Sequence, residues 1–121
     1  MLRKAKSPVE LKFTRAGGSI IVAQVDIWRP TEEGWVLVDQ VKFSDATQQE
    51  EAQDIKLTPD RYTCVFQCFV QESLNGRYDF AFSVEDKATF ADDGDVNTTP
   101  SNDDSKVYKD EFVLAVEGKT R

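Results

Sequence analysis

The sequence predicts an all-β fold, a largely antiparallel β-sandwich of about seven strands. Short runs alternate between apolar and polar residues, which is the period of a strand with one buried face. Turn-forming residues separate these runs at intervals of about 8 to 12 residues, and no run has the spacing of an amphipathic helix. The strands expected on this basis are residues 9–14, 20–28, 35–43, 63–71, 78–84, 88–90 and 107–116.

The first three expected strands follow from this alternation and from the turns between them. Val9, Leu11 and Phe13 alternate with polar residues, and the Gly-Gly pair at 17–18 then marks a turn. In the first half of residues 20–28, the side chains that would point to either face of a strand are apolar. We therefore expect a central strand that is buried on both faces there. A short connection containing proline and glycine leads to 35–43, so these two strands are expected to pair as a hairpin.

The segment from 44 to 54 is polar and lacks bulky apolar residues. Three structures fit this composition: a loop, one helical turn, or a solvated edge strand that begins near Glu51. Ile55 and Leu57 then restart the alternation of apolar and polar residues.

The sequence Leu57-Thr-Pro-Asp-Arg-Tyr62 precedes the clearest alternation in the chain, residues 63–71. This pattern resembles a corner found in bacterial prealbumin-like and immunoglobulin-like β-sandwich modules, which usually reads Leu-x-Pro-Gly-x-Tyr. In that resemblance Pro59 helps to form the corner and Tyr62 enters the next strand, while Asp60 stands where those modules carry glycine. The resemblance therefore implies a sandwich corner at 57–62.

The second half of the chain contains further turn signals. Asn75-Gly76 is the strongest short signal for a hairpin, because both central residues of such a turn take positive φ. It leads into the alternation of 78–84, and residues 85–87 are expected to turn the chain into 88–90. Residues 91–105 consist mainly of Asp, Asn, Thr, Ser, Gly and Pro and are expected to be a structureless loop.

Length and cysteine content indicate one domain in a reducing compartment. The 121 residues suit one domain, expected over 9–117, with a flexible basic leader at 1–8 and a tail at 118–121. The leader lacks the apolar run of a secretory signal, and no stretch is apolar enough to cross a membrane. Cys64 and Cys68 would lie about 13 Å apart along one strand, beyond the ~7 Å limit for a disulfide. Two free thiols favour a cytoplasmic location.

Charge and composition exclude several classes of function. The formal net charge is −7, so the basic surface that nucleic acids require is missing. The chain has no histidine, which excludes Ser–His and Cys–His nucleophile pairs and every histidine-bound metal. Adjacent carboxylates in strands point to opposite faces and do not converge on a substrate. We therefore expect a protein that is not an enzyme, with no catalytic residues.

The expected loop at 91–105 suggests a calcium site as one alternative. Calcium takes six to eight oxygen ligands, and sandwich-edge loops rich in aspartate provide them without helices. The candidate ligands are Asp92, Asp93, Asp95, Asn97 and Asp103. The other interpretation is a solvated loop whose charge maintains solubility. Calcium is the only cofactor that the sequence suggests.

The two tryptophans suggest a carbohydrate-binding site as a second alternative. Trp28 and Trp35 flank the expected hairpin turn, where paired aromatic rings can stack on sugar rings. The other interpretation is a cross-strand pair that covers one end of the core. Our leading prediction is a non-enzymatic binding or interaction module that acts through the loops at one end of the sandwich or through a sheet edge. Its expected partner is a protein, either a different chain or a second copy of itself, and neither nucleic acid nor a membrane.

Overall fold

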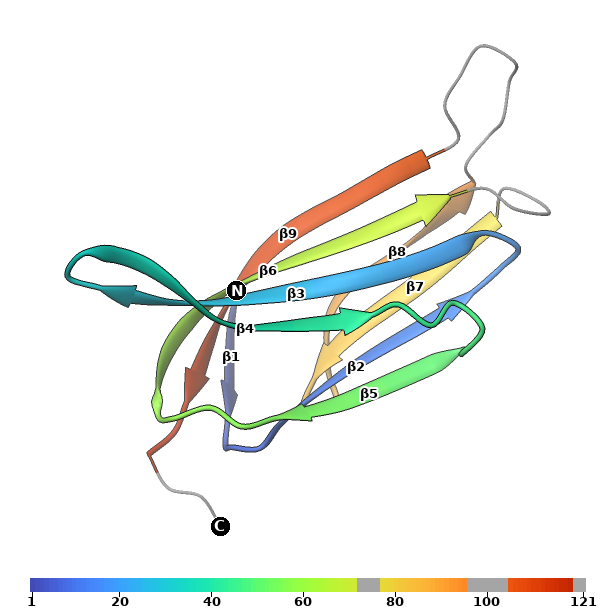
Figure 1. Cartoon of the computed structure of the whole chain (residues 1–121). Helices are drawn as coiled ribbons and strands as arrows, with labels where there is room; N and C mark the ends of the chain where they lie inside the picture. Colours follow the sequence, from blue (N-terminus) through green and yellow to red (C-terminus); the bar gives the residue numbers. More distant parts are fainter. Residues whose placement is uncertain (72–76, 96–104, 119–121) are drawn as a thin grey trace.

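The computed structural model describes residues 1–71, 77–95 and 105–118. In these residues the chain forms nine strands and no helix, arranged as two facing sheets (Figure 1). One sheet has the strand order β1-β9-β6-β3-β4 and the other β5-β2-β7-β8, and every pair except β1 and β9 is antiparallel. The strands are β1 Leu2–Ala5, β2 Val9–Ala16, β3 Ile20–Thr31, β4 Gly34–Phe43, β5 Glu50–Ile55, β6 Asp60–Gln71, β7 Arg77–Val84, β8 Lys87–Asp95 and β9 Ser105–Val116.

The predicted all-β sandwich is confirmed, with nine strands instead of about seven. Alternation along each strand builds the core, because every second side chain points into the space between the sheets. In β6 the inward residues are at most 2% exposed: Tyr62, Cys64, Phe66, Cys68 and Val70. The described residues form no helix long and apolar enough to cross a membrane.

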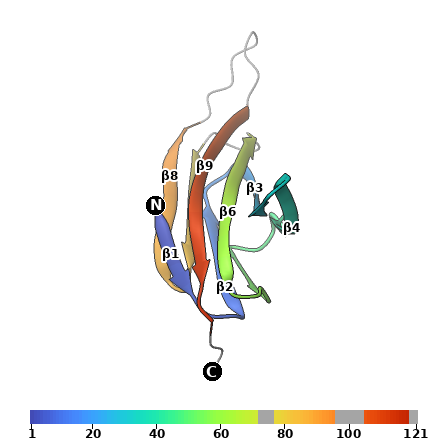
Figure 2. The same cartoon turned by 90° about the vertical axis from the view of Figure 1, so that its left-hand side faces the viewer.

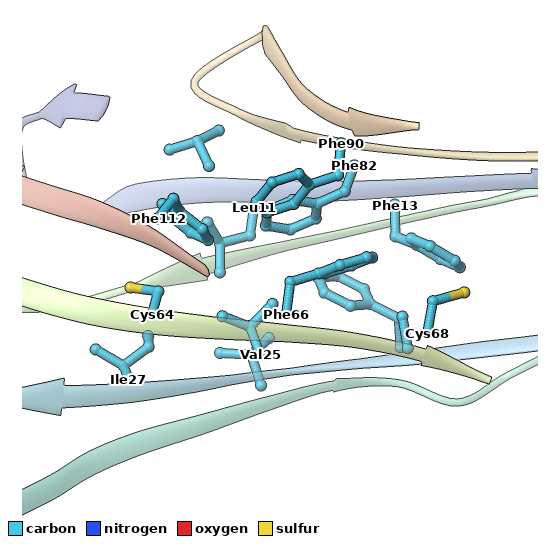
Figure 3. Packing of buried hydrophobic residues seen from close by; sticks show 14 of the residues in the cluster. Leu11, Phe13, Val25, Ile27, Cys64, Phe66, Cys68, Phe82, Phe90 and Phe112 are labelled. Carbon is cyan, nitrogen blue, oxygen red and sulfur yellow. The ribbon is translucent and has the colours of Figure 1, made fainter. Parts of the chain in front are cut away.

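Aromatic rings from both sheets meet at the centre of the core (Figure 3). The ring of Phe66, from the five-stranded sheet, lies 4.8 Å from that of Phe82 and 5.4 Å from that of Phe90, measured between centroids. Phe13 of β2 lies 6.2 Å from Phe66 and 5.7 Å from Phe43. The two sheets are therefore joined mainly by buried aromatic surface, which stabilises the sandwich through the hydrophobic effect.

The predicted flexible leader at residues 1–8 is wrong, because Leu2–Ala5 forms β1. This strand pairs in parallel with Val113–Val116 of β9. The Arg3 guanidinium also reaches the other sheet, where it donates hydrogen bonds to the Thr89 hydroxyl (3.0 Å) and the Ala88 carbonyl (2.6 Å). Parallel pairing with a strand at the far end of the chain has no local signature, so alternation could not reveal it.

Three further segments refine the expected boundaries. Of the alternatives for 44–54, the edge strand is observed, as β5 against β2. The structureless loop expected at 91–105 is wrong at its beginning, because β8 continues to Asp95 beside β7, and residues 96–104 lie outside the described part of the chain. The expected burial of both faces in the first half of 20–28 is also wrong, since Ile20 is 43% exposed.

The corner and the turns have defined local geometry. The Tyr62 hydroxyl donates a hydrogen bond to the Thr58 carbonyl (2.6 Å), which fixes the chain where it enters β6. Glu85 and Asp86 both take positive φ, 51° and 64°, as a two-residue hairpin turn requires, so the turn expected between β7 and β8 is confirmed. The predicted Asn75-Gly76 turn lies outside the described residues.

Candidate functional site

The outer surfaces of the two sheets differ in character. Among the described residues, the large apolar side chains that remain exposed lie in the five-stranded sheet or directly precede it: Met1, Leu2, Ile20, Trp35, Val36, Leu37, Phe69 and Val107. The outer surface of the four-stranded sheet instead carries small, polar and charged side chains such as Lys12, Thr14, Asp79, Ala81 and Asp93. We call the outer surface of the five-stranded sheet the recognition face.

Strand register orders the recognition face into rows that cross the strands. β9 and β6 run side by side along the molecule (Figure 2), and β3 and β4 extend the same rows. The first row is apolar, and its members are Val22, Phe69 and Val107. The second row combines lysine with glutamine: Lys42, Gln24, Gln67 and Lys109.

In the next two rows the charged row comes first and the apolar row second. The third row is acidic at β3 and β9, and its members are Gln40, Asp26, Val65 and Glu111. The fourth row is again mainly apolar: Leu37, Trp28, Thr63, Val113 and Leu2. These four rows therefore have apolar outer members and a charged centre in which the basic and acidic rows lie next to each other. Beyond them lie Ile20 and Gln71 at one end of the face, and Arg61 and Lys4 at the other.

An open hollow lies at the third and fourth rows. It has a volume of about 330 Å³, its lining is mainly apolar, and it is lined by Trp28, Trp35, Thr63, Val65 and Glu111. The β3–β4 hairpin extends beyond the rest of the sandwich and twists there (Figure 1), and the pairing of β3 with β4 shifts register at Ile27/Trp28. Trp28 lies opposite Leu37 and Trp35 lies opposite Pro30, so the tryptophans are not direct cross-strand partners. They nevertheless line one hollow.

The centre of the recognition face is held by a small hydrogen-bond network. The Asp26 carboxylate accepts hydrogen bonds from the side-chain amides of Gln24 (2.9 Å) and Gln40 (2.8 Å). These bonds are made within the chain and orient three polar side chains. The polar centre is therefore partly preorganised, which reduces the entropy that binding would cost.

The edges of the five-stranded sheet carry features that oppose pairing with another strand. On the edge strand β4, the register shift near Val38 interrupts regular pairing, and Asp39 lies opposite the buried Ile27, on the core side of the sheet. β1 pairs only with Val113–Val116, so the preceding part of β9 forms the other edge of this sheet, and its Asp110 likewise lies opposite the buried Phe66. Bulges and inward-pointing charges are common means of preventing edge-to-edge association. These features make the recognition face a better candidate than the edges for binding a partner.

The predicted calcium ligands are only partly described. Asp92 accepts a hydrogen bond from the Tyr78 hydroxyl (3.1 Å) and forms an ion pair with Lys106 (3.4 Å), and this cluster joins the two sheets. Lys106 donates a hydrogen bond to the Tyr78 hydroxyl (2.6 Å), and this bond, together with the charge of Asp92, raises the pKa of Lys106. Asp93 and Asp95 follow on β8, while Asn97 and Asp103 lie outside the described residues.

Alternation on β8 separates two of these ligands. Asp93 lies opposite Asp79 on the outer surface of the four-stranded sheet, so it points away from Asp92. In the described part of the chain, no group of three or more His, Cys, Asp or Glu residues is arranged to hold a metal ion. Calcium binding stays a prediction.

The two cysteines are buried thiols on β6. Burial raises the pKa of both Cys64 and Cys68 from the ordinary value of 9.0 to about 12. A thiol acts as a nucleophile or metal ligand through its thiolate, and that form is strongly disfavoured here at neutral pH. Both residues therefore serve as core side chains.

Sequence reasoning found the two tryptophans but not the face to which they belong. Phe69, Val107 and Glu111 lay within expected strands, and none of them was singled out as a site residue. The chain matches no protein-family model, no curated protein and no solved structure. Its function is therefore argued from the site alone.

Proposed function

We propose that this chain is a non-catalytic protein-interaction module whose binding site is the recognition face. The observation that carries the proposal is the difference between the two outer surfaces: in the described residues, exposed large apolar side chains lie in the five-stranded sheet or directly precede it. Exposed apolar surface of this kind, with polar groups among it, is typical of interaction sites. The resemblance of residues 57–62 to prealbumin-like and immunoglobulin-like modules is supported by the Tyr62–Thr58 hydrogen bond.

The arrangement of the face suits a protein partner. Apolar side chains such as Phe69 and Trp35 provide surface whose burial drives association. The hollow can accept one bulky side chain, as an anchor pocket does at a binding hot spot. The charged rows between the apolar rows then set the orientation of the partner, because a mismatched charge is costly at an interface.

Comparative capture tests this proposal. The wild-type chain, a Phe69→Asp variant and an Ala81→Asp variant are immobilised and exposed to lysate from cells that express the protein, and bound proteins are identified by mass spectrometry. Phe69 lies on the recognition face and Ala81 on the outer surface of the other sheet, so both substitutions add one exposed charge. We expect Phe69→Asp to abolish specific capture and Ala81→Asp to retain it. Equal capture by both variants would contradict the proposal.

A carbohydrate ligand is the second candidate function, favoured by the position of both tryptophans around one hollow. A pyranose presents an apolar face to aromatic rings and hydroxyl groups to acceptors such as the Glu111 carboxylate. Titration of tryptophan fluorescence with a panel of glycans tests this candidate. We expect saturable quenching that Trp35→Ala removes, and flat titrations across the panel would contradict it.

A further inference from the structure

We propose that the partner of the recognition face is a second copy of the same chain, bound face to face about a two-fold axis. This inference rests on the proposed function, since it names the occupant of that site. Its basis is the order of the four rows, which is apolar, basic, acidic and apolar. A surface with this order is complementary to itself when one copy is rotated to run in the opposite direction.

The two-fold axis lies in the plane of the interface and crosses the strands between the basic and acidic rows. It passes over the row formed by Val25, Phe66 and Asp110, whose side chains lie on the core side of the sheet. Rotation about this axis places each strand over the same strand of the other copy, in the opposite direction. The basic row of each copy then faces the acidic row of its partner, and every contact occurs twice, as two-fold symmetry requires.

Charge complementarity supports this axis over a two-fold axis that runs parallel to the strands. Lys109 of one copy faces Glu111 of the other on β9, and Gln24 faces Asp26 on β3. A two-fold axis parallel to the strands, midway between β6 and β3, would instead place Lys42 over Lys109, and Gln40 over Glu111. Because like charges oppose association, the row order favours the axis that crosses the strands.

The apolar rows provide the burial that such a dimer needs. The first row of each copy, which contains Phe69, faces the fourth row of its partner. Phe69 is 41% exposed and lies on β6, and the hollow of the partner contains Thr63 and Val65 of the same strand. The Phe69 ring therefore enters the partner's hollow over Thr63, beside Trp28. Two rings and two hollows form the apolar ends of one interface, and sheets commonly pack face to face at about 10 Å.

The test is sedimentation velocity with four samples over a range of concentrations: the wild-type chain, Lys109→Glu, Glu111→Lys, and an equimolar mixture of these two variants. Both residues are exposed, so folding is retained, and circular dichroism checks it. We expect the wild type to dimerise, and each single variant to raise the dimer dissociation constant at least about tenfold, since each replaces two attractive contacts with two repulsive ones. The mixture is expected to regain dimers, because one variant is acidic at both positions and the other is basic at both.

Each result decides the inference. Recovery in the mixture is expected only if position 109 of one copy faces position 111 of the other, and dimers unaffected by either substitution would overturn the proposed interface. A wild-type chain that stays monomeric at all concentrations would overturn the second copy as occupant. In that case, capture that depends on Phe69 would still support the proposed function, so the two proposals fail separately.

Discussion

Substitution of Phe66 by alanine is expected to lower the free energy of unfolding by about 3–5 kcal/mol, the largest effect of any single change that we propose. The Phe66 side chain is fully buried, and its ring lies within 6.2 Å of those of Phe13, Phe82 and Phe90, measured between centroids. These neighbours come from three strands of the opposite sheet and are held by backbone pairing. They cannot move together to fill the space, so a cavity adds to the loss of buried apolar surface.

Phe69→Ala is the matched control for this prediction. Phe69 lies on the same strand, three residues further along, and is 41% exposed on the outer surface. Its replacement is expected to change the free energy of unfolding of the monomer by no more than about 0.5–1 kcal/mol. Urea unfolding followed by circular dichroism measures both variants at a protein concentration below dimerisation. Equal losses in the two variants would contradict burial of the Phe66 ring as the source of the effect.

The sequence predicted the strands best where one face is apolar and the other polar. In β7, Tyr78, Phe80 and Phe82 alternate with Asp79, Ala81 and Ser83, and the first three are buried as expected. Such alternation identifies both the strand and its inward face, because a shift of one residue would expose every large side chain. The predicted hairpin of β3 and β4 was correct for the same reason, although its end extends further than expected.

Alternation fails where both faces of a strand are apolar. Residues 20–25 indicated burial on both sides, yet Ile20 is exposed and Val22 lies on the recognition face. A sequence cannot distinguish an outer surface covered by another layer from one that is free to bind a partner. This ambiguity concealed the recognition face, whose apolar residues were all assigned to strands but not to a common surface.

The remaining parts of the site could not be predicted because they depend on long-range strand register. Phe69, Val22 and Val107 become neighbours only because β6 pairs with β3 on one side and with β9 on the other. The hollow likewise needs Glu111 of β9 beside the tryptophans of β3 and β4. No local pattern specifies these pairings, so the two tryptophans could be proposed from the sequence, but the complete site could not.

Arg15 is a buried cation that connects the four-stranded sheet to the polar segment between β4 and β5. Its guanidinium forms an ion pair with the Glu51 carboxylate and donates hydrogen bonds to the Asp45 and Phe43 carbonyls. It also lies over the Phe13 ring, 5.0 Å from the ring centroid. The side chain is only 5% exposed, so its charge depends on these partners in place of water.

Arg15→Met is therefore expected to lower the free energy of unfolding by about 3 kcal/mol, because it leaves Glu51 partly buried without its cation and removes donors from two carbonyls. Lys12→Met on the same strand is the control: Lys12 pairs with Glu50 (3.6 Å) and Asp86 (3.4 Å) at the surface, where solvent screens the charges, so stability should stay nearly unchanged. Urea unfolding of both variants is the measurement.

A double variant, Arg15→Met with Glu51→Leu, is expected to recover part of the loss, since removing both charges leaves neither one unpaired. If the double variant lost as much stability as the sum of its two single variants, the ion pair would not be the source of the effect.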